Sequence, residues 1–326
     1  MYSFIFPGQG SQSLGMGKFL FDEFPVSRTT FEEASDALSL DIKKLCFNSS
    51  EQELALTENT QPALLTVSVA TARVLKSTFG LSPVATAGHS IGEYSSLVVA
   101  ESLRFSDAVK AVRFRGQAMQ SAVPVGEGGM TAVLGLGEAQ IHFLCQWTEK
   151  QSGYAPVNPA NFNCDGQIVI SGNLKALNWL KENFSLIISS EIFAENGLPT
   201  PSRAKLISLQ VSAPFHCALM KPAEEKMKHY LNDIVFKNAI IPVFQNYNAK
   251  AETNADSLRE NLIQQVSGSV KWTQSLGAMK AAGYTQFIEC GNGSVLKGLL
   301  KKIDPEFTVF TTTSIEDLKL IEAAQK

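Results

Sequence analysis

A serine flanked by glycines is the feature of this sequence whose spacing most directly indicates chemistry. Residues 88–92 read Gly-His-Ser-Ile-Gly and match the pattern G-x-S-x-G. This pattern is typical of a tight strand-to-helix turn that exposes a serine hydroxyl at the end of a sheet. Small apolar residues, 84–87, precede it and an apolar helical stretch follows it. We therefore predict that Ser90 is a nucleophile; the alternative is a glycine-lined turn that carries a buried serine.

A serine nucleophile needs a base, and the chain has four histidines. His142 and His229 lie on predicted helices, where a packing or solvated role is typical. His89 is next to the serine but points elsewhere on such a turn, so we expect it to make a structural hydrogen bond. His216 follows a predicted strand and stands at the predicted start of a helix. By elimination, His216 is the predicted base.

A second glycine pattern, Gly8-Gln9-Gly10, follows the first predicted strand at 2–6. A dinucleotide-binding fingerprint would need a third glycine at position 13 and an acidic residue about 20 positions later, at the end of a second strand. The chain has Ser13 there and no acidic residue so placed, so we reject a Rossmann cofactor site. Glycines in this loop would instead let backbone N–H groups come close to a reacting oxygen.

The elements that must position these residues follow an α/β order. Strand, turn and helix recur along the chain, which is typical of a mainly parallel sheet with covering helices. Helical patterns extend over 27–47, 58–79 and 105–121, and the short strands end at the two glycine turns. Near the C-terminus, 307–311 is predicted to be an edge strand.

Beyond a glycine-rich linker the pattern changes in a way that indicates an inserted unit. The order strand, helix, strand, strand, helix, strand is that of ferredoxin-like modules, and we place a small subdomain at 128–206. Residues 1–127 and 207–326 are then two parts of one discontinuous core. Within the insert, a helix is predicted over 173–183, and 185–203 is predicted to form an irregular surface loop.

Composition narrows the class of protein. Hydrophobic residues make up 44% and charged residues 18%, which rules out a disordered chain or a coiled coil. The 28 basic and 31 acidic residues give a net charge of −3, which argues against general nucleic-acid binding. The N-terminus does not resemble a signal peptide, and no segment approaches the ~18 apolar residues of a membrane span. Five cysteines without a C-x-x-C pair favour reduced thiols, so we expect a soluble, cytoplasmic protein.

Seven segments in order, from residue 4 to about residue 303, together resemble the malonyl-CoA:acyl carrier protein transacylases of type II fatty-acid synthesis. They are Phe6-Pro7-Gly8-Gln9-Gly10-Ser11-Gln12, Thr60-Gln61-Pro62-Ala63, Gly88-His89-Ser90-Ile91-Gly92-Glu93-Tyr94, Arg115-Gly116-Gln117-Ala118-Met119-Gln120, Asn161-Phe162-Asn163, Pro214-Phe215-His216 and Val270-Lys271-Trp272. The likeness covers nearly the whole chain. It implies an α/β-hydrolase-like core with a ferredoxin-like insert, in agreement with the boundaries above.

The resemblance implies an acyltransferase that moves malonyl from malonyl-CoA to the phosphopantetheine thiol of acyl carrier protein in a ping-pong reaction. Ser90 would carry the malonyl group and His216 would move the proton. Backbone N–H groups of Gln9 and Ile91 would bind the oxyanion, and the backbone carbonyl of Gln265 would orient the histidine. No cofactor or metal is implied, because the coenzyme A thioester is a substrate. We expect a monomer.

The resemblance also assigns residues to substrate selection. Arg115 would form a bidentate pair with the free malonyl carboxylate, whereas an unrelated helical arginine would normally be solvated. Asn161 and Asn163 belong to a family motif and are expected at the substrate. Ile91 and Phe215 favour malonyl over methylmalonyl, because Phe215 would fill the space of an α-methyl group.

The role of three lysines, and three alternative functions of the protein, remain open at this point. Lys297, Lys301 and Lys302 lie on or near one predicted helix, where the family meets its acidic carrier protein; a solvated helix face is the alternative. A serine thioesterase or other hydrolase would normally have its histidine near the C-terminus. A polyketide-pathway acyltransferase would share all of these residues. A relative that binds carrier protein without turnover would not need them.

Overall fold

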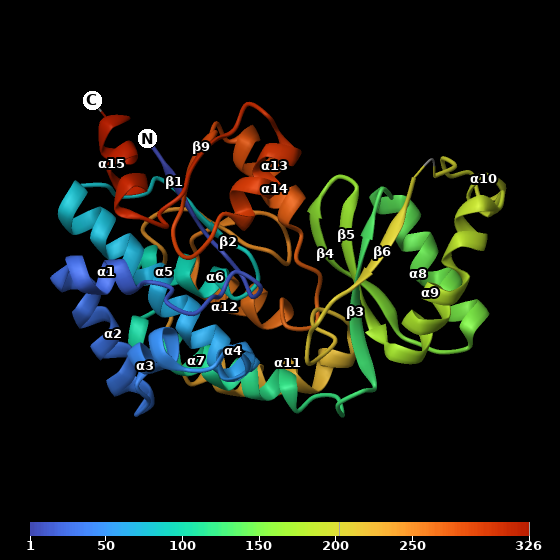
Figure 1. Cartoon of the computed structure of the whole chain (residues 1–326), viewed down its shortest axis with the longest axis horizontal. Coiled ribbons are helices and arrows are strands. Elements are labelled where there is room, and N and C mark those ends of the chain that lie inside the picture. The colour runs from blue at the N-terminus through green and yellow to red at the C-terminus, as the bar shows by residue number, and fades with distance from the viewer. Residues whose placement is uncertain (202, 326) are drawn as a thin grey trace.

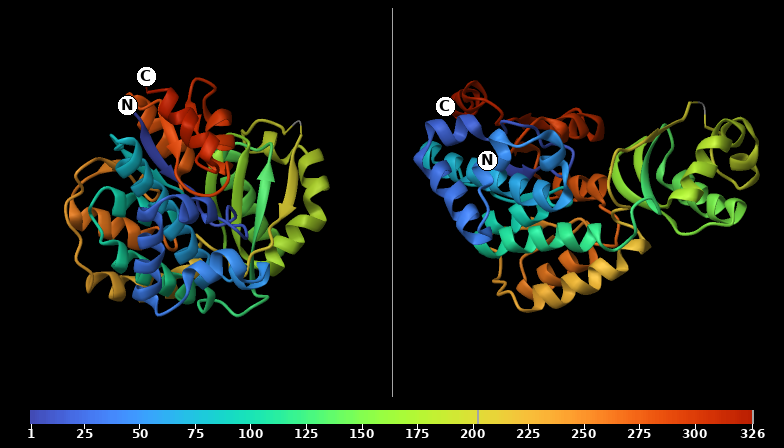
Figure 2. Two further views of the ribbon diagram at one scale, coloured as in Figure 1. Left: turned by 60° about the vertical axis from the view of Figure 1, so that its left-hand side comes forward. Right: turned by 60° about the horizontal axis from the view of Figure 1, so that its bottom comes forward.

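The computed structural model describes residues 1–201 and 203–325; residues 202 and 326, which fall in the predicted insert and the predicted core, lie outside the described residues. The chain forms two lobes, each built around one sheet (Figures 1 and 2). Within the described residues, one sheet has six strands in the order β10-β9-β1-β2-β7-β8, and the other has four in the order β4-β5-β3-β6. The predicted α/β fold class is confirmed.

The six-stranded sheet forms the centre of the larger lobe. Its strands are β1 (Ser3–Phe6), β2 (Thr86–Gly88), β7 (Val243–Phe244), β8 (Ala251–Glu252), β9 (Gln286–Glu289) and β10 (Thr308–Phe310). The β7–β8 pair is antiparallel and the other pairs are parallel. Side chains alternate along β1: Phe4 packs in a cluster with Leu318, and Ile5 in another with Trp272. Helices therefore cover both faces of the sheet.

Six helices of the larger lobe, α1 to α4, α6 and α7, pack against α5, which is buried along most of its length up to Leu75. The helices of the larger lobe are α1 (Lys18–Glu23), α2 (Pro25–Leu38), α3 (Ile42–Asn48), α4 (Glu51–Ala55), α5 (Thr57–Phe79), α6 (Gly92–Val99), α7 (Phe105–Gln120), α11 (Lys221–Asn232), α12 (Ala255–Gln264), α13 (Trp272–Ala281), α14 (Val295–Ile303) and α15 (Ile315–Ala323). Among the described residues, no helix is both long and apolar enough to span a membrane.

The single helix predicted over 27–47 is wrong, because the chain breaks there into α2 and α3. Ser39 ends α2 in the left-handed backbone region, with φ of 49°. Asp41 then caps α3 by accepting a hydrogen bond from the Lys44 N–H at 2.8 Å. The apolar periodicity continues across the break, since residues from both helices reach the same core.

The smaller lobe, green to yellow in Figure 1, is a ferredoxin-like unit. It consists of β3 (Gly128–Leu134), α8 (Glu138–Ser152), β4 (Val157–Cys164), β5 (Gln167–Asn173), α9 (Leu174–Ser189), α10 (Ile192–Glu195) and β6 (Lys205–Ser208). All of its strand pairs are antiparallel. The strand order and the strand-helix-strand repeat are those of the predicted split βαβ arrangement. The insert boundaries at 128 and 206 remain a prediction, and β6 extends to Ser208.

The irregular loop predicted over 185–203 is wrong over much of its length. Helix α9 continues to Ser189, and α10 follows it almost at once. The segment is helical because its apolar side chains pack inward: Ile187, Ile192 and Phe193 are buried in the core of the smaller lobe. These side chains hold the segment against the lobe as helix.

The two glycine turns lie side by side at the carboxyl ends of β1 and β2, two central strands of the six-stranded sheet. Phe6 at the end of β1 lies opposite Gly88 at the end of β2, so the loops that follow the two strands are neighbours. In parallel sheets this carboxyl edge is where ligands bind. The smaller lobe is joined to the same region, because the Phe162 N–H donates to the Val270 carbonyl at 2.9 Å and the Val270 N–H donates to that of Ala160 at 2.8 Å.

Candidate active site

Ser90 occupies a tight turn between β2 and α6. Its backbone is in the left-handed region, with φ of 52°, a strained conformation for a residue with a side chain. A Cβ atom on Gly88 would lie 2.0 Å from the backbone carbon of Gly92, and one on Gly92 would lie 2.2 Å from the Phe6 oxygen. Both glycines of the pattern are therefore required by close backbone approach, as expected for a turn that exposes a serine.

Replacing Gly92 by alanine is expected to lower the free energy of unfolding by about 1–3 kcal/mol, because the new methyl group can fit only if the Phe6 backbone moves. Urea denaturation measures the change. Gly277→Ala on α13 is the matched control: a Cβ there meets no atom within 4 Å, so helix propensity should raise stability by about 0.5–1 kcal/mol. Equal effects at both glycines would contradict the steric argument.

His216 is the histidine that reaches the serine. Its Nε2 lies 2.7 Å from the Ser90 Oγ, and its Nδ1 lies 2.9 Å from the Gln265 carbonyl oxygen and 3.2 Å from that of Gly268. Two carbonyl acceptors require a proton on Nδ1, which leaves Nε2 free to accept the serine proton. Burial, followed by the nearby charge of Arg115, lowers the pKa of His216 to about 3. The imidazole is therefore neutral around pH 7 and has the form that a base needs.

The local structure around His216 differs from the prediction that it begins a helix. His216 lies in a turn, with φ of 59°, ahead of a short 3-10 helix at Ala218–Met220 that leads into α11. The turn directs the imidazole toward both the serine and the carbonyls that follow α12.

Arg115 extends from α7 to the same serine and is only 2% exposed. Its Nη1 donates to Gln61 Oε1 at 3.0 Å, and its Nη2 donates to Gln265 Oε1 at 3.0 Å and to Ser90 Oγ at 3.2 Å. Among the described residues it has no ion-pair partner, and its Nε makes no hydrogen bond. Burial lowers the pKa of this guanidinium. A buried, positively charged fork that forms no direct ion pair is suited to binding an anionic group.

Two backbone donors border the serine. The Gly8 backbone lies so close to the serine turn that a Cβ on it would be 2.7 Å from the His89 carbonyl oxygen, and this contact places Gln9 beside the turn. Gln9 and Ile91 both line the cavity in front of Ser90. Neither backbone N–H donates a hydrogen bond to another described residue. They are the N–H groups to which the resemblance assigns the oxyanion.

The cavity in front of Ser90 has a volume of about 180 Å³ and lies between the two lobes. It is lined by Gln9, Gln61, His89, Ser90, Ile91, Arg115, Met119, Met130, Asn161, Asn163, Val169, Leu209, Val211, Phe215 and His216. All the residues expected at the substrate thus border one space, although Asn163 also has another contact. Its Oδ1 lies 2.8 Å from His89 Nε2, while the His89 ring meets that of Trp272 edge-on.

The three lysines expected at a carrier-protein surface do not border this cavity. They lie on α14, where Lys301 and Lys302 are exposed and Lys297 is half-buried. The Lys302 Nζ donates to the Gln167 Oε1 of the smaller lobe at 3.1 Å. A role in docking remains a prediction.

Sequence reasoning missed Asn246, which braces the serine turn. Its Oδ1 accepts the Ser90 N–H at 2.7 Å, and its Nδ2 donates to the Gly88 carbonyl at 2.7 Å. Glu93 belongs to the serine motif, but the sequence alone gave it no role. Its buried carboxylate accepts hydrogen bonds from the Asn246 N–H at 2.8 Å, Gln265 Nε2 at 3.0 Å and Gln245 Nε2 at 3.0 Å.

The environment of Glu93 opposes its ionisation. Burial raises the pKa of this carboxyl to about 7, although the three hydrogen bonds and the charge of Arg115 favour the ionised form. Glu93 therefore holds Asn246 and Gln265 in place from beneath the serine turn, without contacting the cavity.

Known proteins resemble the chain along nearly its whole length. The acyl transferase domain model matches residues 3–303. A malonyl CoA-acyl carrier protein transacylase of Bacillus subtilis is 41% identical over 98% of this chain and 95% of its own, and one of Escherichia coli is 43% identical over 93% and 92%. A solved malonyl-transacylase in complex with its type II PKS acyl-carrier protein has a TM-score of 0.90 at 37% identity, covering 99% of both chains. The chain therefore belongs to the malonyl CoA-acyl carrier protein transacylase family of acyltransferases.

Proposed function

We propose that the protein transfers malonyl from malonyl-CoA to the phosphopantetheine thiol of an acyl carrier protein, through a malonyl ester on Ser90, and so supplies fatty-acid synthesis. One observation carries the proposal. The Ser90 Oγ lies 2.7 Å from a neutral histidine nitrogen and 3.2 Å from a buried guanidinium that forms no ion pair with a described residue. A nucleophile, a base and a site for a carboxylate thus meet at one oxygen.

In the first half-reaction, the Ser90 Oγ attacks the thioester carbonyl carbon of malonyl-CoA while His216 Nε2 accepts the serine proton. The carbonyl oxygen becomes an oxyanion, and the free N–H groups of Gln9 and Ile91 stabilise it. The carbon–sulfur bond then breaks, and His216 returns the proton to the leaving coenzyme A thiolate. The malonyl group remains on Ser90 as an ester.

In the second half-reaction, the carrier-protein thiol gives its proton to the same His216 nitrogen and attacks the ester. The oxyanion forms again in the same place, and the serine oxygen leaves with the proton. The Gln265 and Gly268 carbonyls keep the proton on Nδ1 and so preserve Nε2 for both transfers. The sequence of steps uses no cofactor.

Arg115 selects the acyl group. Its Nε–H and the Nη1 N–H that makes no hydrogen bond with a described residue can pair with the malonyl carboxylate, which is desolvated in the cavity. An acetyl group offers no such partner. Phe215, buried at the cavity wall, limits the space beside the α-carbon and favours malonyl over methylmalonyl.

The carrier protein is an acidic partner, and Lys297, Lys301 and Lys302 on α14 are proposed to meet it. The support is their shared helix, the exposure of Lys301 and Lys302, and the related malonyl-transacylase that was solved with its carrier protein. A cytoplasmic location and a monomeric state complete the proposal.

Intact-mass measurement tests the proposed intermediate. After malonyl-CoA is added, the wild-type mass should rise by one malonyl group, and Ser90→Ala should show no increase. Addition of phosphopantetheinylated carrier protein should restore the original mass and produce malonyl-carrier protein. Release of free malonate in its place would indicate a hydrolase, and an unmodified wild type would overturn the proposal.

A further inference from the structure

A second and larger cavity lies in the larger lobe, away from the serine, and opens to solvent. Its volume is about 460 Å³, within the range of small-molecule sites, which is roughly 300–1,000 Å³. Its walls come from α5, from the connection between α6 and α7, and from two segments that precede strands: Ser82 and Pro83 before β2, and Ile240 and Ile241 before β7. It therefore lies toward the amino ends of parallel strands, whereas Ser90 follows the carboxyl end of β2.

The walls of this cavity are mostly hydrocarbon. The apolar lining residues are Phe4, Val69, Ala72, Pro83, Val98, Val99, Leu103, Phe105, Val235, Ile240 and Ile241. Val235 and Ile240 are 66% and 64% exposed, so apolar surface continues outward to the solvent. Apolar side chains left open around a cavity of this size favour an apolar ligand.

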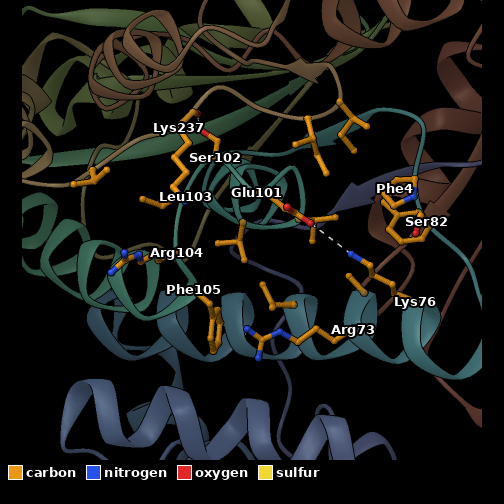
Figure 3. Close-up of a pocket in the computed structure, with 18 residues that line it drawn as sticks. Phe4, Arg73, Lys76, Ser82, Glu101, Ser102, Leu103, Arg104, Phe105 and Lys237 are labelled. Carbon is orange, nitrogen blue, oxygen red and sulfur yellow. Dashed lines mark hydrogen bonds and ion pairs between the residues drawn. The ribbon is translucent and has the colours of Figure 1, made fainter.

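The polar lining residues give the cavity a positive rim. Arg73, Lys76, Arg104 and Lys237 line it, together with a single acid, Glu101 (Figure 3). Lys76 pairs with Glu101 at 3.5 Å, and Arg73 pairs with Glu33 at 2.7 Å. The side chains of Arg104 and Lys237 have no ion pair or hydrogen bond with any other residue in 1–201 and 203–325. Two unpaired cations beside an apolar cavity complement an anion.

Hydrogen bonds fix the walls in position. The Ser102 Oγ donates to the Lys237 carbonyl at 2.7 Å, and the Lys237 N–H donates to that of Ser102 at 2.9 Å. The Ile240 N–H donates to the Ala100 carbonyl at 3.0 Å. These bonds join the segment before β7 to the α6–α7 connection. The cavity is thus pre-formed, which lowers the entropic cost of filling it.

We propose that this cavity binds a straight alkyl chain with an anionic head group, such as a fatty carboxylate. The chain lies along the apolar walls, and the head group pairs with Arg104 and Lys237. Because the cavity lies toward the amino ends of the strands and Ser90 lies at their carboxyl ends, this ligand and malonyl-CoA bind at the same time. The site is distinct from the one around Arg115, which also attracts carboxylates.

Calorimetric titration of the full chain with decanoate tests the proposal. Decanoate should bind saturably below its micelle-forming concentration, with or without saturating malonyl-CoA. Each methylene buried should tighten binding by about fourfold, so hexanoate should bind far more weakly. Decyl phosphate should bind and decyltrimethylammonium should not, which separates recognition of an anionic head group from recognition of the chain alone.

Variants locate the ligand. Arg104→Ala/Lys237→Ala should weaken decanoate binding at least fivefold, and Val235→Ser/Ile240→Ser should weaken it as well; all four side chains are exposed, so the fold should persist. Lys150→Ala and Leu186→Ser, at exposed positions on the smaller lobe, are the matched controls and should change nothing. Binding that is lost in Arg115→Ala and kept in Arg104→Ala/Lys237→Ala would place decanoate at the active site and overturn the proposal. Absence of saturable binding would also overturn it.

Discussion

Replacing Arg115 by alanine is expected to lower kcat/KM for malonyl transfer by about 30- to 5,000-fold. Truncation of one partner of a buried, hydrogen-bonded charge pair costs about 2–5 kcal/mol or more, because the remaining charge is left without a counter-charge. Here that charge is the malonyl carboxylate, and it would face a cavity from which the guanidinium has been removed. Steady-state kinetics with malonyl-CoA and carrier protein measure the loss.

Acetyl-CoA provides the contrast in the same experiment. It has no carboxylate, so Arg115→Ala should lose little acetyl transfer, and the preference for malonyl over acetyl should fall by about the same factor as malonyl kcat/KM. Arg113→Ala is a matched control on the same helix, because Arg113 bonds instead to Glu58 and Asn59 and does not line the cavity. Unchanged malonyl preference in folded Arg115→Ala, with the fold checked by circular dichroism, would refute the assignment.

The proposed nucleophile and base could be identified from the sequence because each has a local signal. The glycines around Ser90 are required because a methyl group at either position would lie 2.0–2.2 Å from backbone atoms. Because only glycine fits there, the turn can be identified from a short sequence motif. His216 could be identified by elimination because the chain has only four histidines. The Arg115 assignment depended on the family resemblance, since an isolated arginine on a helix has no signal of its own.

Asn246 could not be predicted in this way. It meets Ser90 across 156 positions of sequence, and a single asparagine after a two-residue strand belongs to no spacing pattern. The same holds for the side chain of Gln265, whose contacts with Arg115 and Glu93 exist only once three separate segments have packed together. Hydrogen-bond networks of this kind arise from tertiary structure and leave no periodicity.

The helices and strands could be predicted where the apolar periodicity and the turn residues indicated the same boundaries. They could not be predicted where the backbone conformation of one residue determined a boundary. The ferredoxin-like order was visible because strands and helices alternate with clear patterns in the smaller lobe. The break at Ser39 was not, because serine rarely adopts a left-handed backbone and the apolar positions continue beyond it. The helix after residue 183 was missed because its apolar residues pack within a lobe whose extent the sequence defines only loosely.

Replacing His216 by alanine is expected to lower the rate of acyl-enzyme formation by about 10²- to 10⁴-fold, the usual contribution of a positioned general base. The wild-type rate also has a predicted pH dependence. A pKa of about 3 means that His216 takes up a proton only in strong acid, so its basic form is fully populated above about pH 5. The contribution of His216 to the single-turnover rate should therefore stay constant from pH 8 to pH 5, whereas a histidine at its ordinary pKa of ~6.5 would lose most of its basic form over that range.

His229→Ala is the matched control, because His229 is an exposed histidine on α11 and should not change the rate. Quenched-flow mass measurement of the malonyl ester follows acylation directly and separates it from the second half-reaction. The charge of Arg115 helps to lower the His216 pKa, so Arg115→Ala should shift any acid limb of the profile toward higher pH. Acylation that proceeds normally in His216→Ala would exclude it as the base. A wild-type inflection near pH 6.5 that disappears in this variant would keep the base but contradict the buried, neutral environment from which its low pKa follows.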